Sequence, residues 1–213
     1  MLFFESPQEA ILWIFSFLLA LTVHEASHSL AADSFGDPTP RVMGRLTLNP
    51  FAHLDLIGAI FFLVVGLGWA KPVPVNPRYF SHPRRDEFLV SFAGPASNLT
   101  LALLMAGLWR FLVSIAPAVP EAGAAQTPLV FFLGVSLISV KVNIGLALFN
   151  LIPIPPLDGS GMVSALLPAR LEMEYRRIGQ YGFIILFALI FFRAFDRVLF
   201  PLVNKLTGVM IGL

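Results

Sequence analysis

The chain has 213 residues, of which 57% are apolar and 13% are charged, and its formal net charge is +1. Soluble domains carry about a quarter charged residues, so this composition excludes an ordinary water-soluble globule and indicates an integral membrane protein. The small net charge and the lack of a Lys/Arg cluster argue against a nucleic-acid partner. No cysteine is present, which excludes disulfides, thiolate metal ligands and a cysteine nucleophile.

Four segments have the roughly 20 mostly apolar residues that a membrane-spanning helix requires. They are residues 11–32, 88–116, 128–151 and 178–200, with an end near Phe192, before Arg193, as the alternative for the last one. A fifth apolar stretch, residues 54–70, is shorter and contains three glycines. The expected fold is therefore an all-α integral membrane protein with about four transmembrane helices, in one domain that covers residues 1–213.

The basic side chains of the loops predict how the spans are oriented, because Lys and Arg in short loops mark the cytoplasmic side. Residues 33–53, 71–87 and 167–177 carry basic side chains, whereas the N-terminal tail and residues 117–127 carry only acidic ones. Both flanks of residues 54–70 are thus basic, which disfavours a single crossing there. We interpret this stretch as a re-entrant or interfacial segment, with an ordinary fifth span as the alternative.

Two short membrane-associated β-strands are expected next to that stretch. Residues 41–48 alternate weakly between apolar and polar side chains, and residues 69–75 are rich in β-branched and aromatic side chains. Pro72 and Pro74 confine the second strand to a sheet edge. Such an edge is able to accept an extended peptide as an added strand.

An H-E-x-x-H motif, His24-Glu25-Ala26-Ser27-His28, lies inside the first expected span. Residues four apart share one face of a helix, so the two imidazoles can bind one zinc ion with Glu25 close enough to act as a base. Ionisable residues inside an apolar span are costly and indicate function. The alternative is a polar face buried in a helix bundle, which leaves three such groups without a role.

Asp158 is the candidate third ligand, because a catalytic zinc has three protein ligands and one open position. Three prolines between residues 153 and 156 end the third span, and Asp158 stands where a new helix begins. This span runs towards the same membrane face as the first, so it brings Asp158 near His24 and His28. The alternative role for Asp158 is a helix cap.

With these motifs in place, the chain resembles the site-2 proteases, the intramembrane zinc metalloproteases of peptidase family M50. The resemblance rests on the H-E-x-x-H motif, on residues 150–159, which match the pattern N-x-x-P-x-P-x-L-D-G, and on residues 93–98, which resemble A-G-P-x-x-N. Residues 44–50 and 71–76 are similar to the compact branch of the family that lacks a PDZ domain.

The resemblance implies that His24, His28 and Asp158 hold one zinc per chain and that Glu25 is the catalytic base. It also implies that Asn150 binds the substrate or stabilises the oxyanion, although a helix C-cap is an equal alternative for Asn150.

Three residues of the second and third spans are interpreted as packing residues. Asn98 and Asn143 are expected to be buried amides that bridge helices, and Gly94 is expected to allow close helix approach.

The expected activity is hydrolysis of peptide bonds in or near the transmembrane segments of membrane proteins. The expected location is a multi-pass position in the lipid bilayer of a prokaryotic inner membrane, with the site towards the cytoplasmic side. Two alternatives are a catalytically silent homologue that acts as a binding partner and a metal-ion transporter. An intact Glu25 argues against the first, and the lack of repeated motifs argues against the second.

Overall fold

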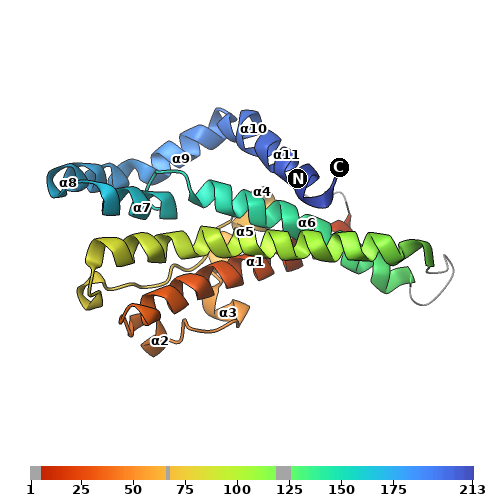
Figure 1. Cartoon of the computed structure of the whole chain (residues 1–213). Coiled ribbons are helices and arrows are strands. Elements are labelled where there is room, and N and C mark those ends of the chain that lie inside the picture. The colour runs from red at the N-terminus through yellow and green to blue at the C-terminus, as the bar shows by residue number, and fades with distance from the viewer. Residues whose placement is uncertain (1–5, 66–67, 119–125) are drawn as a thin grey trace.

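A computed structural model describes residues 6–65, 68–118 and 126–213 of the chain. Its framework is three long helices, α1 (Pro7–Ser34), α5 (Pro83–Ile115) and α6 (Gln126–Asn150), each packed against the other two (Figure 1). Helices α1 and α6 run in the same direction and α5 runs in the opposite one. In the described part of the chain, these are the helices long and apolar enough to cross a membrane, so three of the four expected segments form candidate membrane-spanning helices.

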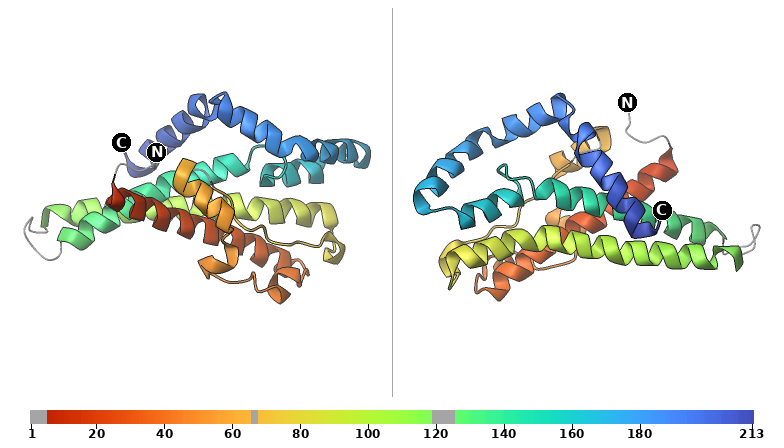
Figure 2. Two further views of the ribbon diagram at one scale, coloured as in Figure 1. Left: turned by 180° about the vertical axis from the view of Figure 1, so that it is seen from behind. Right: turned by 45° about the horizontal axis from the view of Figure 1, so that its top comes forward.

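Shorter elements flank this framework on two sides. Helices α8 to α11 form an arch along α6, and α2 to α4 lie beside α1 (Figure 2). In chain order the shorter elements are α2 (Thr39–Val42), α3 (Pro50–His53), α4 (Leu56–Val65), the 3-10 turns η1 (Pro77–Tyr79) and η2 (Ala116–Ala118), α7 (Asp158–Leu166), α8 (Ala169–Ile178), the 3-10 turn η3 (Gly179–Tyr181), α9 (Gly182–Phe191), α10 (Ala194–Arg197) and α11 (Leu199–Ile211).

Local sequence signals determine where α1 begins. The Ser6 side chain accepts a hydrogen bond of 3.1 Å from the Glu9 backbone N–H, and Pro7 occupies the first helical turn. Ser at the N-cap and Pro at the first position satisfy or remove N–H groups that the helix leaves unpaired. A mostly apolar stretch then runs from Ala10 until the helix reaches His24.

Small side chains allow α5 and α6 to approach closely. Ala102 and Ala106 of α5 form a buried cluster with Val140 and Ile144 of α6 and Val203 of α11. Lipid tails are as apolar as these side chains, so helices in a membrane associate through close packing of this kind rather than through the hydrophobic effect.

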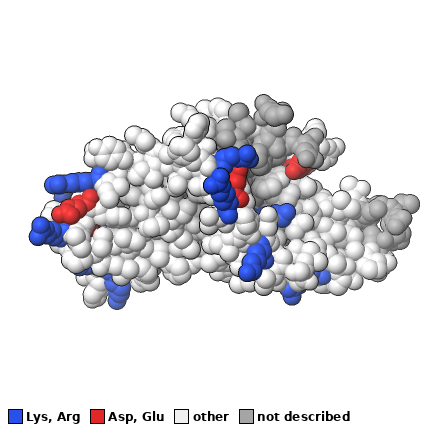
Figure 3. Space-filling model, turned by 90° about the horizontal axis from the view of Figure 1, so that it is seen from above, with Lys and Arg blue, Asp and Glu red and all other residues white. Residues whose placement is uncertain are grey.

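Large apolar side chains cover much of the outer surface. Leu103, Leu104 and Phe111 on α5 and Phe183 and Phe187 on α9 are each more than half exposed. On the face seen in Figure 3, charged side chains gather at the end where α8 lies and in a looser group near the middle, with uncharged surface between the two groups. A surface of this kind suits contact with lipid better than contact with water.

Hydrogen bonds tie the loop after α1 to the loop before α5. The buried Asp37 carboxylate accepts a 2.7 Å hydrogen bond from the Asn76 backbone N–H. The Lys71 N–H donates to His53 O at 2.9 Å, and the buried Arg45 guanidinium donates to Lys71 O. The two loops therefore form one layer against the end of α1.

The two expected β-strands are not confirmed. Residues 41–48 contain the end of α2 and a turn in which Gly44 has a φ of +67°. In residues 69–75 the β-pairing is a single antiparallel bridge between Ala70 and Leu54. The left-handed glycine reverses the first segment, and the two prolines remove N–H donors from the second, so neither extends a ladder.

The two ends of the apolar stretch at residues 54–70 lie next to each other. Its helix α4 has 10 residues, a length of about 15 Å against a hydrocarbon core of about 30 Å. The Leu54–Ala70 bridge joins the two ends of the stretch, and Phe62 of α4 stacks on Phe17 of α1 with 4.0 Å between ring centroids. This is the arrangement that a re-entrant segment requires.

The fourth expected span, residues 178–200, is not confirmed as a continuous helix. Helix α9 has 10 residues, and the chain then turns at Arg193, which has a φ of +55°. At the other end, a Cβ added to Gly182 would lie 2.8 Å from the carbonyl carbon of Pro155, so the segment is held against the proline-rich turn. The turn lies at the alternative end expected near Phe192, and the left-handed Arg193 together with the contact between Gly182 and the distant Pro155 bends the segment into the arch.

Candidate metal centre

Two histidines, one helical turn apart, face the interior of the bundle. His24 and His28 are 4% and 7% exposed, and both lie on the side of α1 that contacts α5. At this end of the bundle α1 and α6 end and α5 begins, so residues from three helices meet.

The turn after α6 places Asp158 next to the two histidines. Pro153, Pro155 and Pro156 prevent a regular helix, and the chain folds back before α7 begins. A Cβ at Gly159 would lie 2.7 Å from Ile152 O, so only glycine fits this close return. The N-cap of α7 is Leu157, with no side-chain cap hydrogen bond, and Asp158 is the first helical residue. The alternative role of Asp158 as the cap is therefore wrong.

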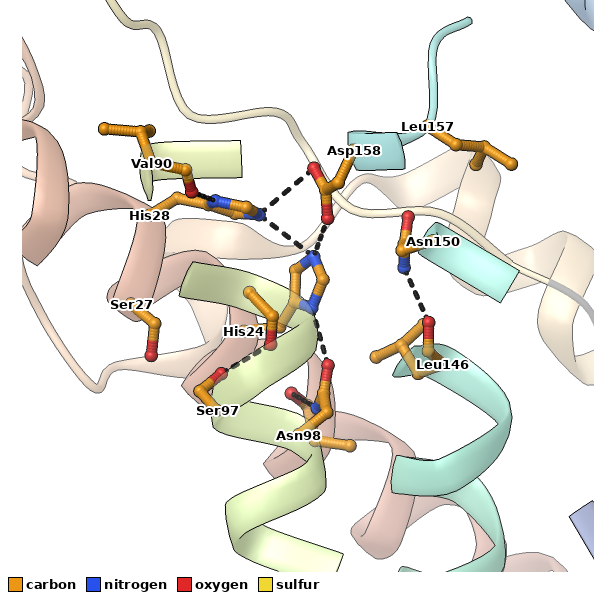
Figure 4. Close-up of polar contacts among 12 residues, drawn as sticks. His24, Ser27, His28, Val90, Ser97, Asn98, Leu146, Asn150, Leu157 and Asp158 are labelled. Carbon is orange, nitrogen blue, oxygen red and sulfur yellow. Dashed lines mark hydrogen bonds and ion pairs between the residues drawn. The ribbon is translucent and has the colours of Figure 1, made fainter. Parts of the chain in front are cut away.

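The three side chains converge on one point (Figure 4). His24 Nε2 lies 3.1 Å from Asp158 Oδ2, and His28 Nε2 lies 3.3 Å from Asp158 Oδ1. The two Nε2 atoms are 3.1 Å apart. Of the described residues, these three form the group whose ligand atoms lie within 4.8 Å of one another.

Hydrogen bonds at the outer nitrogens orient both imidazoles. His24 Nδ1 lies 2.6 Å from Asn98 Oδ1, and His28 Nδ1 lies 2.7 Å from Val90 O. Both partners are carbonyl oxygens, which only accept, so each Nδ1 carries a hydrogen and donates it. A neutral imidazole has one N–H, so each Nε2 presents a lone pair to the centre.

The convergence of acceptors fits a metal cation. Asp158 Oδ2 is buried and has no hydrogen-bond partner, although it lies 3.1 Å from His24 Nε2. Two lone pairs of nitrogen and a carboxylate repel one another at these distances unless a cation lies between them. Ligands at 2.0–2.2 Å from a tetrahedral zinc are separated by about 3.3 Å, close to the three separations observed here, and two His with one carboxylate form a donor set suited to zinc.

Gly94 of α5 forms the floor beneath the two rings. A Cβ added there would lie 2.6 Å from His24 Cε1 and 2.7 Å from His24 Nε2, and it would be closer still to His28 Nε2. Distances below 3.0 Å are essentially never observed for a real Cβ, so the residue must be glycine. The close helix approach expected at this glycine thus occurs directly against the metal centre.

Glu25 is next to the two histidines in the chain and is 8% exposed. Among the described residues its carboxylate has no hydrogen-bond or ion-pair partner, so it is free to accept a proton. The buried guanidinium of Arg45, in the loop after α2, is close enough to interact electrostatically with Glu25. Burial lowers the pKa of Arg45, and the negative charge of Glu25 acts to raise that pKa.

Asn150 stands at the end of α6, beside the turn that leads to Asp158 (Figure 4). Its Nδ2 donates a 3.0 Å hydrogen bond to Leu146 O of the same helix. The amide has a second N–H hydrogen. Asn150 is half-buried, so this hydrogen remains available to another group.

Sequence reasoning missed two contacts that the structure brings to the histidines. Asn98 was expected to bridge helices, yet its Oδ1 also contacts His24, and Val90 contacts His28 through its backbone oxygen. A signal for the first was present: Val90, Gly94 and Asn98 are spaced by four residues and so share one face of α5. The second contact could not be predicted, because every residue has a backbone carbonyl and the residue type does not show which one accepts a hydrogen bond.

The chain is similar in sequence to known proteins. The family model described as Peptidase family M50 matches residues 112–192. The chain is 40% identical over 191 residues to the protein named Putative zinc metalloprotease YwhC of Bacillus subtilis (strain 168), a match that covers 90% of this chain and 85% of that protein.

Mycobacterial proteins are similar as well. The protein named Putative zinc metalloprotease Rip2 of Mycolicibacterium smegmatis is 35% identical over 198 residues, which is 91% of this chain and 71% of that protein. The protein of the same name from Mycobacterium tuberculosis (strain H37Rv) is 32% identical over 185 residues, 84% of this chain and 66% of that protein. No solved structure gives a significant match to the chain.

Proposed function

The chain belongs to the site-2 protease family, peptidase family M50, and from this premise we propose that this metalloprotease hydrolyses peptide bonds in or near the transmembrane segments of other membrane proteins. The observation that supports the proposal is the convergence of His24, His28 and Asp158 at a helix that is itself apolar enough to cross a membrane. A soluble metalloprotease has no reason to carry its ligands on such a helix.

These three residues are the ligands in our proposal, and they would hold one zinc ion per chain. Bound there, zinc would supply Lewis-acid activation of a water molecule and of the scissile carbonyl. The Nε2 lone pairs of both histidines and the unpaired Asp158 Oδ2 already face one another, so little rearrangement is needed for binding.

Proton transfer is assigned to Glu25. Its carboxylate has no partner among the described residues and sits one position from His24, so it can accept the proton of the attacking water and pass it to the leaving amine. We assign to Asn150 the donation of its second N–H to the carbonyl oxygen, where negative charge develops. Donation to Leu146 O holds the Asn150 amide in place for that role.

The substrate class follows from the position of the ligands. His24 lies ten residues before the end of α1, which is about 15 Å at 1.5 Å per residue, or about half the thickness of the hydrocarbon core. A spanning helix hides its carbonyls in backbone hydrogen bonds, so a transmembrane substrate must unwind locally before it is cleaved.

We propose a multi-pass position in a prokaryotic inner membrane, with this end of the bundle towards the cytoplasm. Basic side chains gather here: Arg41 follows α1, Arg84 and Arg85 lie in the first turn of α5, and Arg176 of α8 donates a 2.7 Å hydrogen bond to Glu87 of α5. An excess of Lys and Arg marks cytoplasmic loops.

Metal content and cleavage together test the proposal. Zinc would be measured in detergent-purified wild type, His24→Ala and Asp158→Ala, with Ser27→Ala as the control. Ser27 lies within the same motif, but its Oγ donates to Val23 O of its own helix at 2.7 Å and does not face the centre. We expect both ligand variants to lose zinc and the control to keep it; full zinc in both ligand variants would reject the assignment.

Glu25→Gln separates catalysis from metal binding. Glutamine keeps the size of the side chain but cannot accept the proton, so the variant should retain zinc and fail to cleave a model membrane substrate. Cleavage at the wild-type rate would show that Glu25 is not the base. A wild type that binds zinc but cleaves no membrane substrate would instead support the silent homologue.

A further inference from the structure

Two buried asparagines connect the metal centre to the middle of α6. Asn98 of α5 and Asn143 of α6 are both 0% exposed. Asn143 Nδ2 donates to Ser139 O at 2.8 Å. Asn98 Nδ2 donates to Asn143 Oδ1 at 2.8 Å and to Ala20 O at 3.1 Å. The remaining polar atom of the pair, Asn98 Oδ1, lies 2.6 Å from His24 Nδ1.

The direction of every hydrogen bond in this chain follows from the backbone carbonyls. Ser139 O only accepts, so Asn143 must turn its NH2 group towards it and its oxygen towards Asn98. Asn98 then meets two acceptors with its NH2 group, and its own oxygen faces His24. The hydrogen between them therefore belongs to His24 Nδ1, and the direction is imposed by two backbone carbonyls, Ser139 O of α6 and Ala20 O of α1.

The tautomer of His24 decides whether the site accepts a metal. With the hydrogen on Nδ1, Nε2 offers a lone pair to the centre. In the other tautomer Nε2 would carry the hydrogen and donate it to Asp158 Oδ2, which is 3.1 Å away and otherwise without a partner. That hydrogen bond would leave neither His24 Nε2 nor Asp158 Oδ2 free to bind a metal ion.

We propose that Asn98 and Asn143 are positioning residues, a relay of two amides that holds His24 in the tautomer presenting Nε2 to zinc. The inference rests on the zinc site of the proposed function and adds residues that do not touch the metal. Partners of this kind, behind a metal ligand, affect metal affinity by about 10- to 100-fold.

A purely structural role is the competing explanation, because the same amides also join α1, α5 and α6. Asn98→Asp separates the two roles. An aspartate keeps an acceptor for His24 Nδ1–H but loses both donors that bridge the helices, whereas Asn98→Leu loses all three interactions. Positioning predicts that zinc binds much more tightly to Asn98→Asp than to Asn98→Leu; helix bridging predicts equal affinities.

Zinc affinity of the purified full chain would be measured by competition with a chelator. Asn98→Leu should bind zinc about 10- to 100-fold more weakly than wild type, and Asn98→Asp should stay close to wild type. The control is Ser16→Ala, since Ser16 Oγ donates to Val135 O at 3.3 Å and joins α1 to α6 away from the histidines. It should leave zinc affinity unchanged.

A second readout observes the hydrogen directly. The chain has 4 histidines, so nitrogen NMR of the zinc-loaded, histidine-labelled protein can resolve them. His24 Nδ1 should carry the hydrogen in wild type and in Asn98→Asp. A His24 Nδ1 without a hydrogen in the wild type would overturn the proposal.

The other possible outcomes of the affinity measurement would contradict the proposal. Wild-type zinc affinity in Asn98→Leu, or equal weakening in Asn98→Leu and Asn98→Asp, would overturn positioning. If Asn98→Leu does not fold, Asn143→Leu would be measured in its place. This variant keeps the hydrogen bond from Asn98 to Ala20 O, and an unchanged zinc affinity of Asn143→Leu would overturn the relay of two amides. Failure of the proposed function would give a different result. In that case the wild type would bind no zinc, or its zinc content would be unchanged by His24→Ala.

Discussion

Replacing Gly94 by alanine should weaken zinc binding in an otherwise folded protein. The added Cβ would stand 2.7 Å from His24 Nε2, whereas ordinary contact begins at 3.4 Å. The ring must therefore retreat by about 0.7 Å, several times the roughly 0.2 Å tolerance of a metal–ligand distance. Overpacking of this kind costs about 1–3 kcal/mol, which corresponds to about a 5- to 150-fold loss of zinc affinity if the strain falls on the metal-bound state.

The matched control is Gly107→Ala in the same helix, where an added Cβ meets nothing within 4 Å. Both substitutions favour helix formation to the same extent, so helix propensity cancels in the comparison. Zinc affinity by chelator competition and cleavage of a membrane substrate would be measured for both variants. If Gly94→Ala binds zinc as tightly as Gly107→Ala, the rings do not rest on Gly94 and the reasoning fails.

Three further predictions follow from the geometry. Single cysteines at Ser34 and Ser81, which line one hollow at the end of α1, should react with an impermeant reagent from the same side of the membrane, because we expect the stretch at residues 54–70 to be re-entrant; labelling from opposite sides would contradict this. Gly159→Ala should lose zinc and lower the unfolding temperature, since its Cβ would lie 2.7 Å from Ile152 O, whereas Gly145→Ala should not, because its nearest neighbour is 3.9 Å away. A chelator should abolish cleavage and added zinc should restore it, whereas cleavage that persists in the chelator would contradict a metal-dependent reaction.

Much of the metal centre could be read from the chain itself. The spacing of His24 and His28 places both on one helix face, and the prolines before Asp158 stop the third span where the ligand is needed. These are local rules of helix geometry, so they hold whatever the neighbouring helices do.

The elements that sequence reasoning missed depend on contacts between distant segments. The apolar run at residues 178–200 is long enough to span, and a stop before Arg193 is the alternative end, where the chain does turn. The contact of Gly182 with the distant Pro155 could not be expected from the segment itself. Residues 41–48 alternate weakly as a strand would, but no segment within the described residues forms a β-ladder with them. A strand requires a partner, so its own residues are not sufficient to form it.

The sequence by itself determined the membrane class, three long helices and the chemistry of the ligand set, because apolar length, helical period and ionisable residues are properties of single segments. Tertiary structure alone decided the tautomer of His24 and the closeness of Gly94 to both rings. Those depend on Asn98, Asn143 and two backbone carbonyls on three helices. A hydrogen-bond direction is set by what lies at the far end of the network, and only the packed bundle specifies that.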